Sequence, residues 1–337
     1  MGVKLSNMDI NSKTAHPFRI GFLLIDGFAL MSYSCAVEPL RAANLLSPYA
    51  YGIEHLCLSD HQAVSSSGAR VPAIPVGAAD PALDLILVVA GGDPFKLDSA
   101  TLHTWLRRQA RSGVMIGGVS GGPVLLSKAG LMDGFRMTLH WEHAKALSEE
   151  SPALLIERSL YVIDRNRITC AGGTAPLDMM HALITRQHGA DFARRVSDWF
   201  LHTTVRVSNA PQRSGLSERY GTYDQSVLVV IESMENHIAE PLELTELAAT
   251  VGLGVRQLNR LFQQKLGVST IAFYRQLRLG VAENLLLQSH LSVTDIALAV
   301  GFVSSAHFST CFKARYGVAP SVLRSQSMNS TGAGDNQ

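Results

Sequence analysis

The chain has 337 residues, of which 47% are hydrophobic and 17% are charged, and its formal net charge is +1. This length allows two domains, and the composition allows sizeable cores and excludes a chain that is disordered throughout. No apolar run reaches the 18 residues that a membrane-spanning helix needs, so we expect no membrane segment.

The N-terminal stretch and the cysteines indicate the cellular compartment. Residues 1–17 form a polar stretch without the apolar core of a secretion signal, so we expect a flexible tail on a cytoplasmic protein. The cysteines Cys35, Cys57, Cys170 and Cys311 are scattered without C-x-x-C spacing. They indicate buried thiols in a reducing compartment, and the sequence indicates neither a metal site nor a cofactor.

Strands and helices alternate from residue 18 to about residue 200. The alternation predicts an α/β domain with a mostly parallel sheet and helices on both faces. Ligands of such sheets bind at the carboxyl ends of the strands. We expect strands at 18–25, 51–59, 83–92, 135–143, 160–163 and 167–170, helices at 29–46, 99–112 and 175–188, an irregular hairpin at 65–76, and a strand, sharp turn and helix within 114–134.

The sharp turn carries the chemically active pattern of this domain. Residues 118–122 fit G-x-S-x-G, the nucleophile elbow, with Ser120 between a strand and a helix. A serine hydroxyl reacts only when a base removes its proton, and His140 could be that base, with Glu38 or Asp26 to orient it. The alternative is that glycines beside a tight turn serve only packing.

The stretch 207–222 contains Ser, Gly, Pro and mixed charge, which is typical of a linker between domains. An amphipathic helix is expected at 223–238. The residues after Arg324 are polar and small, so we expect 326–337 to form a flexible tail.

The region 244–317 contains two copies of one sequence pattern. Gly252 corresponds to Gly301 at an offset of 49 residues, and Phe262 corresponds to Phe312 at an offset of 50, so the second copy has one extra residue in its turn. A short helix, a turn with Gly and a second helix form the helix-turn-helix plan of DNA-binding proteins. Apolar residues at helical spacing predict the core: Leu247, Ala248, Val251, Leu258, Leu261 and Phe262, then Ile296, Ala297, Val300, Phe308, Cys311 and Phe312.

The polar residues of each second helix are the predicted DNA-reading groups. They are Arg256, Gln257, Asn259 and Arg260 in the first copy, and Ser305, Ala306, His307, Thr310 and Lys313 in the second. Arg reads guanine, and Gln or Asn reads adenine, through pairs of hydrogen bonds in the major groove. A merely solvated polar face is the alternative, and it is harder to set aside for the second copy. Residues 251–325 carry eight basic against two acidic residues, as phosphate contacts require.

Residues 223–325 resemble the DNA-binding domain of the AraC/XylS family of transcription regulators. The resemblance is carried by Gly301-Phe302, Phe308, Phe312-Lys313, Gly317 and Pro320. It implies two small bundles joined by a long helix at about 271–288, with promoter DNA and RNA polymerase as partners and a spacing of roughly 34 Å between the reading helices. Family members often carry Arg at the position of Thr310, which puts base reading by the second copy in question.

Residues 18–206 resemble the class I glutamine amidotransferase-like, PfpI-type domain. Catalytic members carry Cys at the elbow, where this chain has Ser120, followed by His at the position of His140. The order of the two domains is similar to that of the GlxA-like regulators, near those that control carnitine and glycine betaine catabolism. It implies a homodimeric sensor of a small metabolite, such as a quaternary amine, that activates a catabolic operon.

This resemblance gives the predicted ligand site. The lining residues are Glu38, Ser120, His140 and Trp141, and the outer candidates are Asp26, Tyr33, Phe95 and Thr174. A quaternary ammonium group would bind an aromatic face beside a carboxylate. The alternative function is a serine-dependent hydrolase or amidotransferase with an accessory DNA-binding domain, and a third is an architectural DNA-binding protein with an inert first domain.

Overall fold

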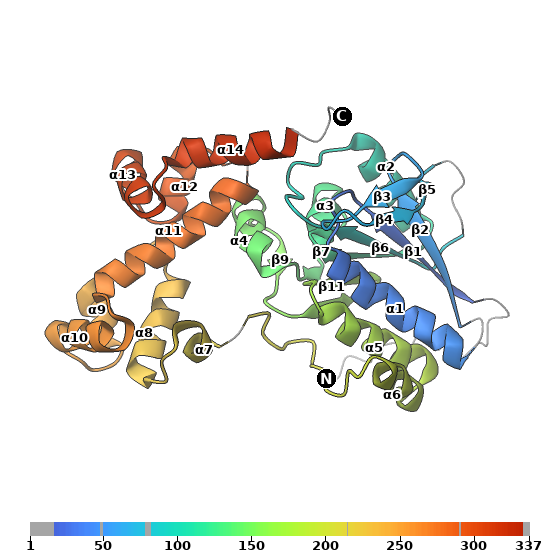
Figure 1. Ribbon diagram of the computed structural model, residues 1–337, viewed down its shortest axis with the longest axis horizontal. Coiled ribbons are helices and arrows are strands. Elements are labelled where there is room, and N and C mark those ends of the chain that lie inside the picture. The colour runs from blue at the N-terminus through green and yellow to red at the C-terminus, as the bar shows by residue number, and fades with distance from the viewer. Residues whose placement is uncertain (1–16, 48–49, 78–81, 214, 290, 333–337) are drawn as a thin grey trace, which may run out of the picture. The chain divides into compact units, whose positions relative to one another are not determined.

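The computed structural model describes residues 17–47, 50–77, 82–213, 215–289 and 291–332 (Figure 1). Two compact units are present, one of Met1–Ala144 with Ala153–Gln212 and one of Lys145–Pro152 with Arg213–Gln337. Of the predicted tails, residues 1–16 and 333–337 lie outside the described residues. Within the described part, no helix is long and apolar enough to cross a membrane, and no group of three or more His, Cys, Asp or Glu side chains could hold a metal ion.

The first unit is built on a seven-stranded sheet with the order β10-β11-β7-β6-β1-β2-β5. Every neighbouring pair is parallel except β10 with β11, so the predicted fold class is confirmed. The central strand β6 is buried along its whole length, as its sequence LILVVA requires. The strands are β1 (Phe18–Leu24), β2 (Tyr51–Cys57), β5 (Ile74–Pro75), β6 (Leu85–Ala90), β7 (Met115–Ser120), β10 (Tyr161–Asp164) and β11 (Arg167–Cys170).

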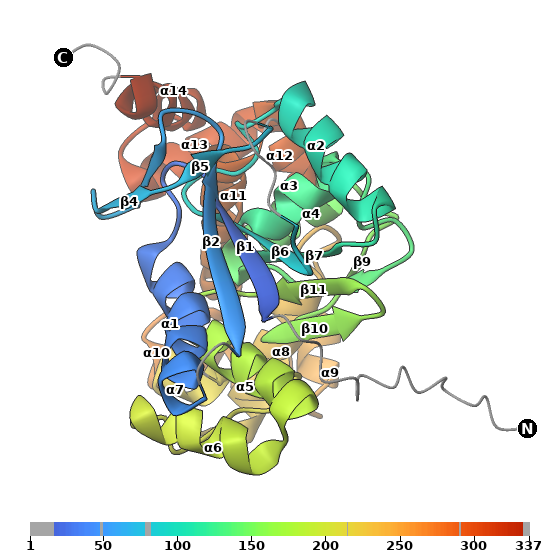
Figure 2. The ribbon, with the colours of Figure 1, turned by 90° about the vertical axis from the view of Figure 1, so that its right-hand side faces the viewer.

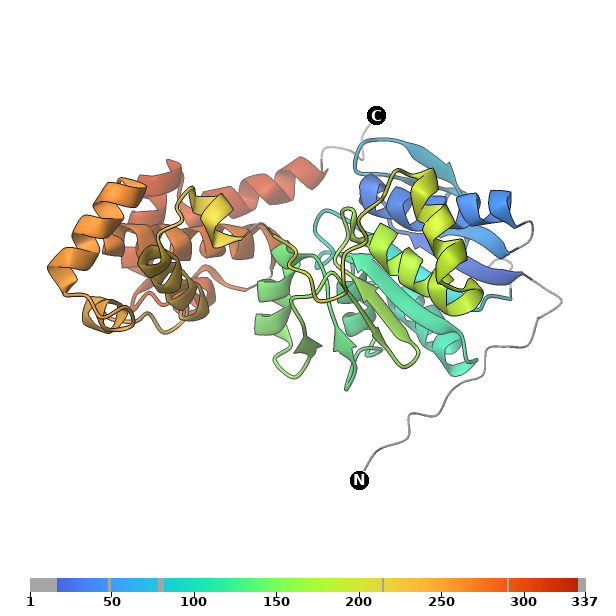
Figure 3. The same cartoon turned by 90° about the horizontal axis from the view of Figure 1, so that it is seen from below.

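Helices cover both faces of this sheet (Figure 2). On one face α1 (Leu30–Leu46), α5 (Ala175–His188) and α6 (Ala190–Trp199) pack on one another, and Figure 3 shows them from below. On the other face lie α2 (Ala100–Arg111) and α3 (Gly122–Lys128). Two small paired sets of strands lie outside the sheet: β3 (Gln62–Val64) with β4 (Arg70–Pro72), and β8 (Arg136–Met137) with β9 (Leu155–Ile156).

The expected strand at 135–143 is wrong for most of its length. Only Arg136–Met137 pair as β8, and a helix, α4 (Trp141–Glu150), begins three residues after Thr138. His143, Ala146 and Leu147 are buried at three- and four-residue spacing, which is a helical period and not a strand period. The helical spacing begins only after His140, so the apolar character of 135–141 misled the strand assignment.

The second unit is entirely helical in its described part from residue 215 onward. Each helix-turn-helix consists of a short helix, a turn with a left-handed glycine (Gly252 or Gly301) and a longer helix. The long helix α11 joins the two pairs (Figure 1). The helices are α7 (Leu216–Tyr220), α8 (Gln225–Asn236), α9 (Leu244–Ala249), α10 (Val255–Leu266), α11 (Thr270–Gln288), α12 (Val293–Ala299), α13 (Ser305–Tyr316) and α14 (Pro320–Gly332).

Two segments that we expected to be irregular contain helices. The stretch 207–222, interpreted as a linker, contains α7, whose Arg219 is paired with Glu235 of α8 at 3.0 Å. Gln212 in the same stretch donates from Nε2 to Thr138 Oγ1 and to the carbonyl oxygens of Leu139 and Ser159. Helix α14 runs through 326–332, where we expected a flexible tail.

Specific end contacts fix the helices of the second unit. Ser269, Ser292 and Ser304 accept backbone N–H groups at the starts of α11, α12 and α13. Gly267 and Gly317 end α10 and α13 in the left-handed conformation that favours glycine. The predicted core residues are buried or half-buried, with Val251, Leu261 and Cys311 in the half-buried class.

Candidate functional site

Ser120 ends β7 with φ at +60°, a conformation that non-glycine residues rarely adopt. Ser120 is only 6% exposed. Gly121 donates its N–H to Ala90 O at 3.1 Å. A Cβ on Gly122 would lie 2.0 Å from Val88 O, so α3 starts directly against β6. The strained turn has the geometry of a nucleophile elbow.

Ser32 of α1 is a polar neighbour of Ser120 that the sequence analysis did not identify. A Cβ on Gly172, which has φ at +91°, would lie 2.7 Å from Ser120 Cβ and 2.9 Å from Ser32 Oγ. Ser32 Oγ also accepts the N–H of Gly173 at 2.8 Å. The loop after β11 and the first turn of α1 therefore close around Ser120. Both follow carboxyl ends of parallel strands, which is the signal that could have identified Ser32.

The backbone of His140 contacts the elbow at Ser120. Its N–H donates to Ser120 O at 3.2 Å, and its Nδ1 lies 3.7 Å from Glu142 Oε2. Burial lowers the pKa of His140 below its ordinary value, and the Glu142 carboxylate opposes that shift. The imidazole ring lies 5.4 Å from the Trp141 ring, and Trp141 is 38% exposed. The imidazole of His140 and the indole of Trp141 thus form one aromatic surface, on the residues that follow the backbone contact with Ser120.

The carboxylates that we expected to orient His140 bind elsewhere. Glu38 is ion-paired with Arg41 at 2.6 Å, and Asp26 accepts the N–H of Val64 at 2.8 Å. Glu38 lies six residues beyond Ser32 on α1, roughly 9 Å further along the helix axis. The carboxylate beside His140 is therefore that of Glu142, and the relay through Glu38 or Asp26 that we expected is not formed.

The outer candidates Tyr33, Phe95 and Thr174 have partners of their own within the first unit. Tyr33 shares a hydrogen bond with His55 Nε2 at 2.8 Å, and burial, with a contribution from Glu38, raises the pKa of Tyr33 to about 12. Phe95 is buried and its ring lies 6.1 Å from that of His143. Thr174 Oγ1 accepts a hydrogen bond from Arg206 Nη2.

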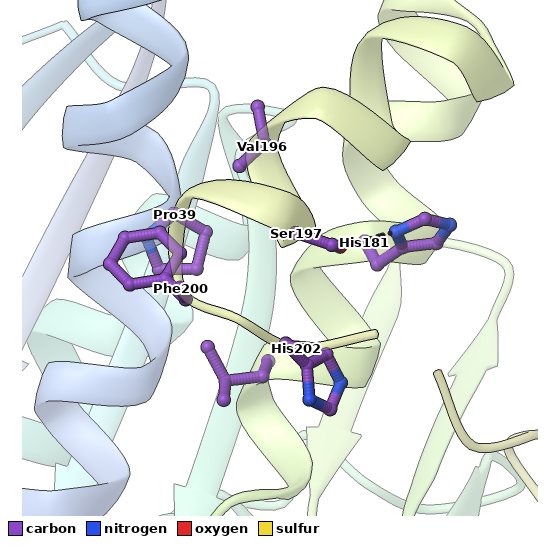
Figure 4. Close-up of a pocket in the computed structure, with 7 residues that line it drawn as sticks. Pro39, His181, Val196, Ser197, Phe200 and His202 are labelled. Carbon is purple, nitrogen blue, oxygen red and sulfur yellow. Dashed lines mark hydrogen bonds between the residues drawn. The ribbon is translucent and has the colours of Figure 1, made fainter. Parts of the chain in front are cut away.

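A second polar cluster lies between α5, α6 and the segment that follows them. The fully buried Asp178 accepts hydrogen bonds from Arg206 Nε and Nη2 at 2.9 and 2.6 Å, and it contacts His202 Nε2 at 3.0 Å. The adjoining small pocket is drawn in Figure 4 and contains no predicted site residue. Its lining residues are Pro39, Leu177, His181, Val196, Ser197, Phe200 and His202. Because the His181 and His202 rings are already hydrogen-bonded to Ser197 and Asp178, this cluster is a structural anchor.

In the first helix-turn-helix, α10 exposes Arg256, Gln257 and Arg260. Gln257 Oε1 also accepts the N–H of Gly254 at 2.9 Å, which caps the helix. Asn259 is half-buried, and its Oδ1 accepts the N–H of Thr270 at 3.1 Å. Asn259 therefore already has a structural partner, whereas both arginines are available to a ligand.

In the second helix-turn-helix, α13 exposes His307, Thr310 and Lys313, while Ser305 is half-buried. Two of these side chains are engaged within the helix: Thr310 Oγ1 donates to Ala306 O at 3.0 Å, and His307 Nε2 lies 3.4 Å from Cys311 Sγ. Arg278 of α11 holds the preceding turn by donating to Val300 O at 2.7 Å and to Gly301 O at 2.5 Å.

Comparisons with known proteins agree with this architecture. The helix-turn-helix domain family matches residues 247–326, and the DJ-1/PfpI family matches residues 18–186. The HTH-type transcriptional regulator GlxA of Rhizobium meliloti is 45% identical over 322 residues, covering 95% of this chain and 99% of the relative. The HTH-type transcriptional regulator GbdR of Pseudomonas aeruginosa is 40% identical over 309 residues, covering 90% of this chain and 83% of the relative.

A solved structure gives the same result for part of the chain. The crystal structure of an AraC family transcriptional regulator from Pseudomonas putida has a TM-score of 0.51 and 29% identity, covering 55% of this chain and all of that one. The two domain matches and the near full-length relatives confirm both resemblances. The chain thus belongs to the family of DNA-binding transcriptional regulators that carry a DJ-1/PfpI domain ahead of an AraC-type helix-turn-helix domain.

Proposed function

We propose that this regulator binds promoter DNA through α10 and α13 and that a small metabolite bound beside Ser120 controls it. The exposed arginines Arg256 and Arg260 support the DNA-reading role of α10, because a guanidinium donates two hydrogen bonds to guanine. The family resemblance supports the proposal that the two helices enter adjacent major grooves. A ligand can regulate only if it binds one arrangement of the protein more tightly than the other.

The observation that supports the sensor role is an elbow whose expected orienting carboxylates, Glu38 and Asp26, bind elsewhere. Ser120 keeps the left-handed backbone of a nucleophile. The carboxylates that we expected to orient His140, however, bind Arg41 and the backbone of Val64. Strain of this kind persists where the surrounding structure fixes it, and such places are commonly ligand sites. An elbow whose expected orienting carboxylates bind elsewhere favours binding over turnover, so we propose that the chain is not an enzyme.

For the ligand we propose a quaternary amine of the carnitine or glycine betaine type. The Trp141 and His140 rings offer an aromatic surface that would attract a cation, and Glu142, which sequence reasoning did not consider, offers the carboxylate. Ser32 replaces Glu38 in the proposed lining because it lies next to Ser120 and Gly172.

We further propose a homodimer formed through the first domain, activation of a catabolic operon through contact with RNA polymerase, and a cytoplasmic location where the DNA is. The first two of these three proposals rest on the family resemblance, and the third rests on the polar N-terminal stretch and the scattered cysteines.

A thermal-shift measurement on the full-length protein tests the sensor role. Glycine betaine and carnitine should raise the unfolding temperature, and glycine, which lacks the methylated ammonium group, should not. Trp141→Leu should abolish the shift, whereas Trp199→Leu, at a more exposed tryptophan, should leave it intact. Hydrolysis of simple esters or amides that Ser120→Ala removes would instead favour the enzyme. If neither glycine betaine nor carnitine raises the unfolding temperature, the proposed ligand class is refuted.

A further inference from the structure

The outward stripes of the two reading helices carry opposite chemistry at equivalent positions. On α10 the exposed residues at four-residue spacing are Arg256, Arg260 and Gln264. At the offset of 50 residues that relates the two copies, α13 exposes Ala306, Thr310 and Ala314. Residues four apart lie on one face of a helix, so each trio forms one continuous stripe. Every long polar side chain of the first stripe is replaced by a short one that ends in a methyl group.

The remaining polar groups near the stripe of α13 are occupied within the protein. Thr310 donates its hydroxyl to Ala306 O, which leaves its methyl group as the free part of the side chain. Ser304 Oγ accepts the N–H of His307 and so caps the helix. The His307 ring contacts Cys311 through Nε2 and lies 5.6 Å from the Phe302 ring. Few hydrogen-bonding groups are therefore left to contact a base edge.

The turn before α13 adds a further apolar group. Val303 is 98% exposed and immediately precedes the N-cap Ser304. It lies in the turn that is one residue longer than the turn of the first copy. The N-terminal residues of a recognition helix contact base edges, so Val303 stands where it would meet the floor of the groove. An apolar side chain with so much exposure gains free energy when a partner covers it.

We propose that the second helix-turn-helix reads thymine through its 5-methyl groups, while the first reads bases by hydrogen bonding. Val303, Ala306 and Thr310 would contact the methyl groups, which are the apolar feature of the major groove. The exposed cations Lys313 and Arg315 on the same helix suit the phosphates on either side, which favours DNA as the occupant of this face. This inference rests on the proposed DNA-reading role of α13.

The test starts from sites that the full-length protein selects from a random duplex pool. Each thymine of a selected site is then replaced by deoxyuridine, which lacks only the methyl group. At one or more thymines of one half-site, the affinity should fall about fourfold per methyl group, as expected for one buried methyl-sized group. In the half-site bound by α10, the same replacement should change the affinity less than twofold.

Two variants connect these losses to α13. Thr310→Ser removes one methyl group and keeps the hydroxyl that binds Ala306 O. The variant should therefore bind the thymine site about fourfold less tightly than the natural protein does. Replacing the contacted thymine by deoxyuridine should then cause no further loss of affinity. Val303→Thr should act in the same way at a neighbouring thymine. Thr294→Ser, at an exposed position of α12, is the matched control and should behave like the natural protein.

The outcomes separate the two levels of the proposal. If no sequence is enriched from the pool, the DNA-reading role itself fails. If sites are enriched but deoxyuridine has no effect at any thymine, or if its effect is the same in Thr310→Ser and Val303→Thr as in the natural protein, the methyl-reading inference is overturned while sequence-specific binding stands.

Discussion

Asn259 Oδ1 accepts the backbone N–H of Thr270 at 3.1 Å, which ties α10 to the first residue of α11. The first N–H groups of a helix have no partner inside it, so an acceptor is needed there. The equivalent residues of the second copy are Ser309 and Pro320, at the offset of 50. Proline has no N–H, so α14 starts without an acceptor. The need for Asn259 is therefore specific to the first copy.

Replacement of Asn259 tests this relationship. Asn259→Ala should lower the free energy of unfolding of the second unit by about 1 kcal/mol, the usual effect of losing a helix-end acceptor. Ser309→Ala is the matched control and should change it by less than about 0.5 kcal/mol. Urea unfolding of both variants measures the difference. Equal losses in the two variants would contradict the role of the Thr270 N–H.

The two arginines of α10 should contribute directly to specificity. Arg256→Ala or Arg260→Ala should weaken binding to a selected site by about 1–3 kcal/mol and relax the base preference at one position. Lys313→Ala should weaken binding to all sequences alike and reduce the salt dependence by about one counterion. Fluorescence anisotropy on matched and mismatched sites at several salt concentrations separates these effects. Unchanged base preference in both arginine variants would count against α10 as the reading helix.

The left-handed backbone of Ser120 predicts that glycine is more stable there. Ser120→Gly should raise the free energy of unfolding by up to about 1 kcal/mol, because glycine has no Cβ to strain at φ +60°. Ser120→Ala keeps the Cβ and should give no such gain. Both variants should bind DNA without ligand as the natural protein does, and both should respond less to a betaine. A loss of DNA binding in Ser120→Ala would show that the residue serves the fold.

The buried Asp178 predicts an asymmetry between two substitutions. Arg206→Ala leaves a fully buried carboxylate with fewer donors and should cost about 3 kcal/mol of stability. Asp178→Ala leaves Arg206, which is 38% exposed, free to turn to solvent, so it should cost less. Thermal or urea unfolding gives the order, and the reverse order would contradict the anchor role of this pair.

Three half-buried histidines and the exposed His188 of the first unit predict its pH dependence. Burial lowers the pKa of His55, His140, His181 and His188 below the ordinary value of 6.5. The unfolded chain therefore binds more protons than the folded chain below that value, and the free energy of unfolding should fall as the pH is lowered from about 7.5 to about 5.5.

His55→Gln should reduce this slope, because it removes one group that resists protonation in the folded state. His61→Asn, at an exposed histidine, is the control and should leave the slope unchanged. Urea midpoints at several pH values give the slopes. A stability that rises toward acid would contradict the assigned direction of these pKa shifts.

Local patterns in the sequence were enough for the fold class, the elbow and the duplicated helix-turn-helix. An all-apolar run such as LILVVA, a glycine-flanked Ser120 and a repeated helical period each carry their meaning within a few residues. The same reasoning failed at 135–143, where the apolar strand-like run ends at His140 and a helix begins.

Partnerships between distant residues were decided only by the tertiary structure. The sequence alone could not show that Ser32 meets Ser120, that Glu38 binds Arg41 instead of facing the elbow, or that Asn259 caps α11. A side chain's residue type states what it can bind, but its partner depends on which strand ends and helix turns the fold brings within about 3 Å of it. Composition and periodicity do not determine those distances, because they depend on how elements far apart in the chain pack together.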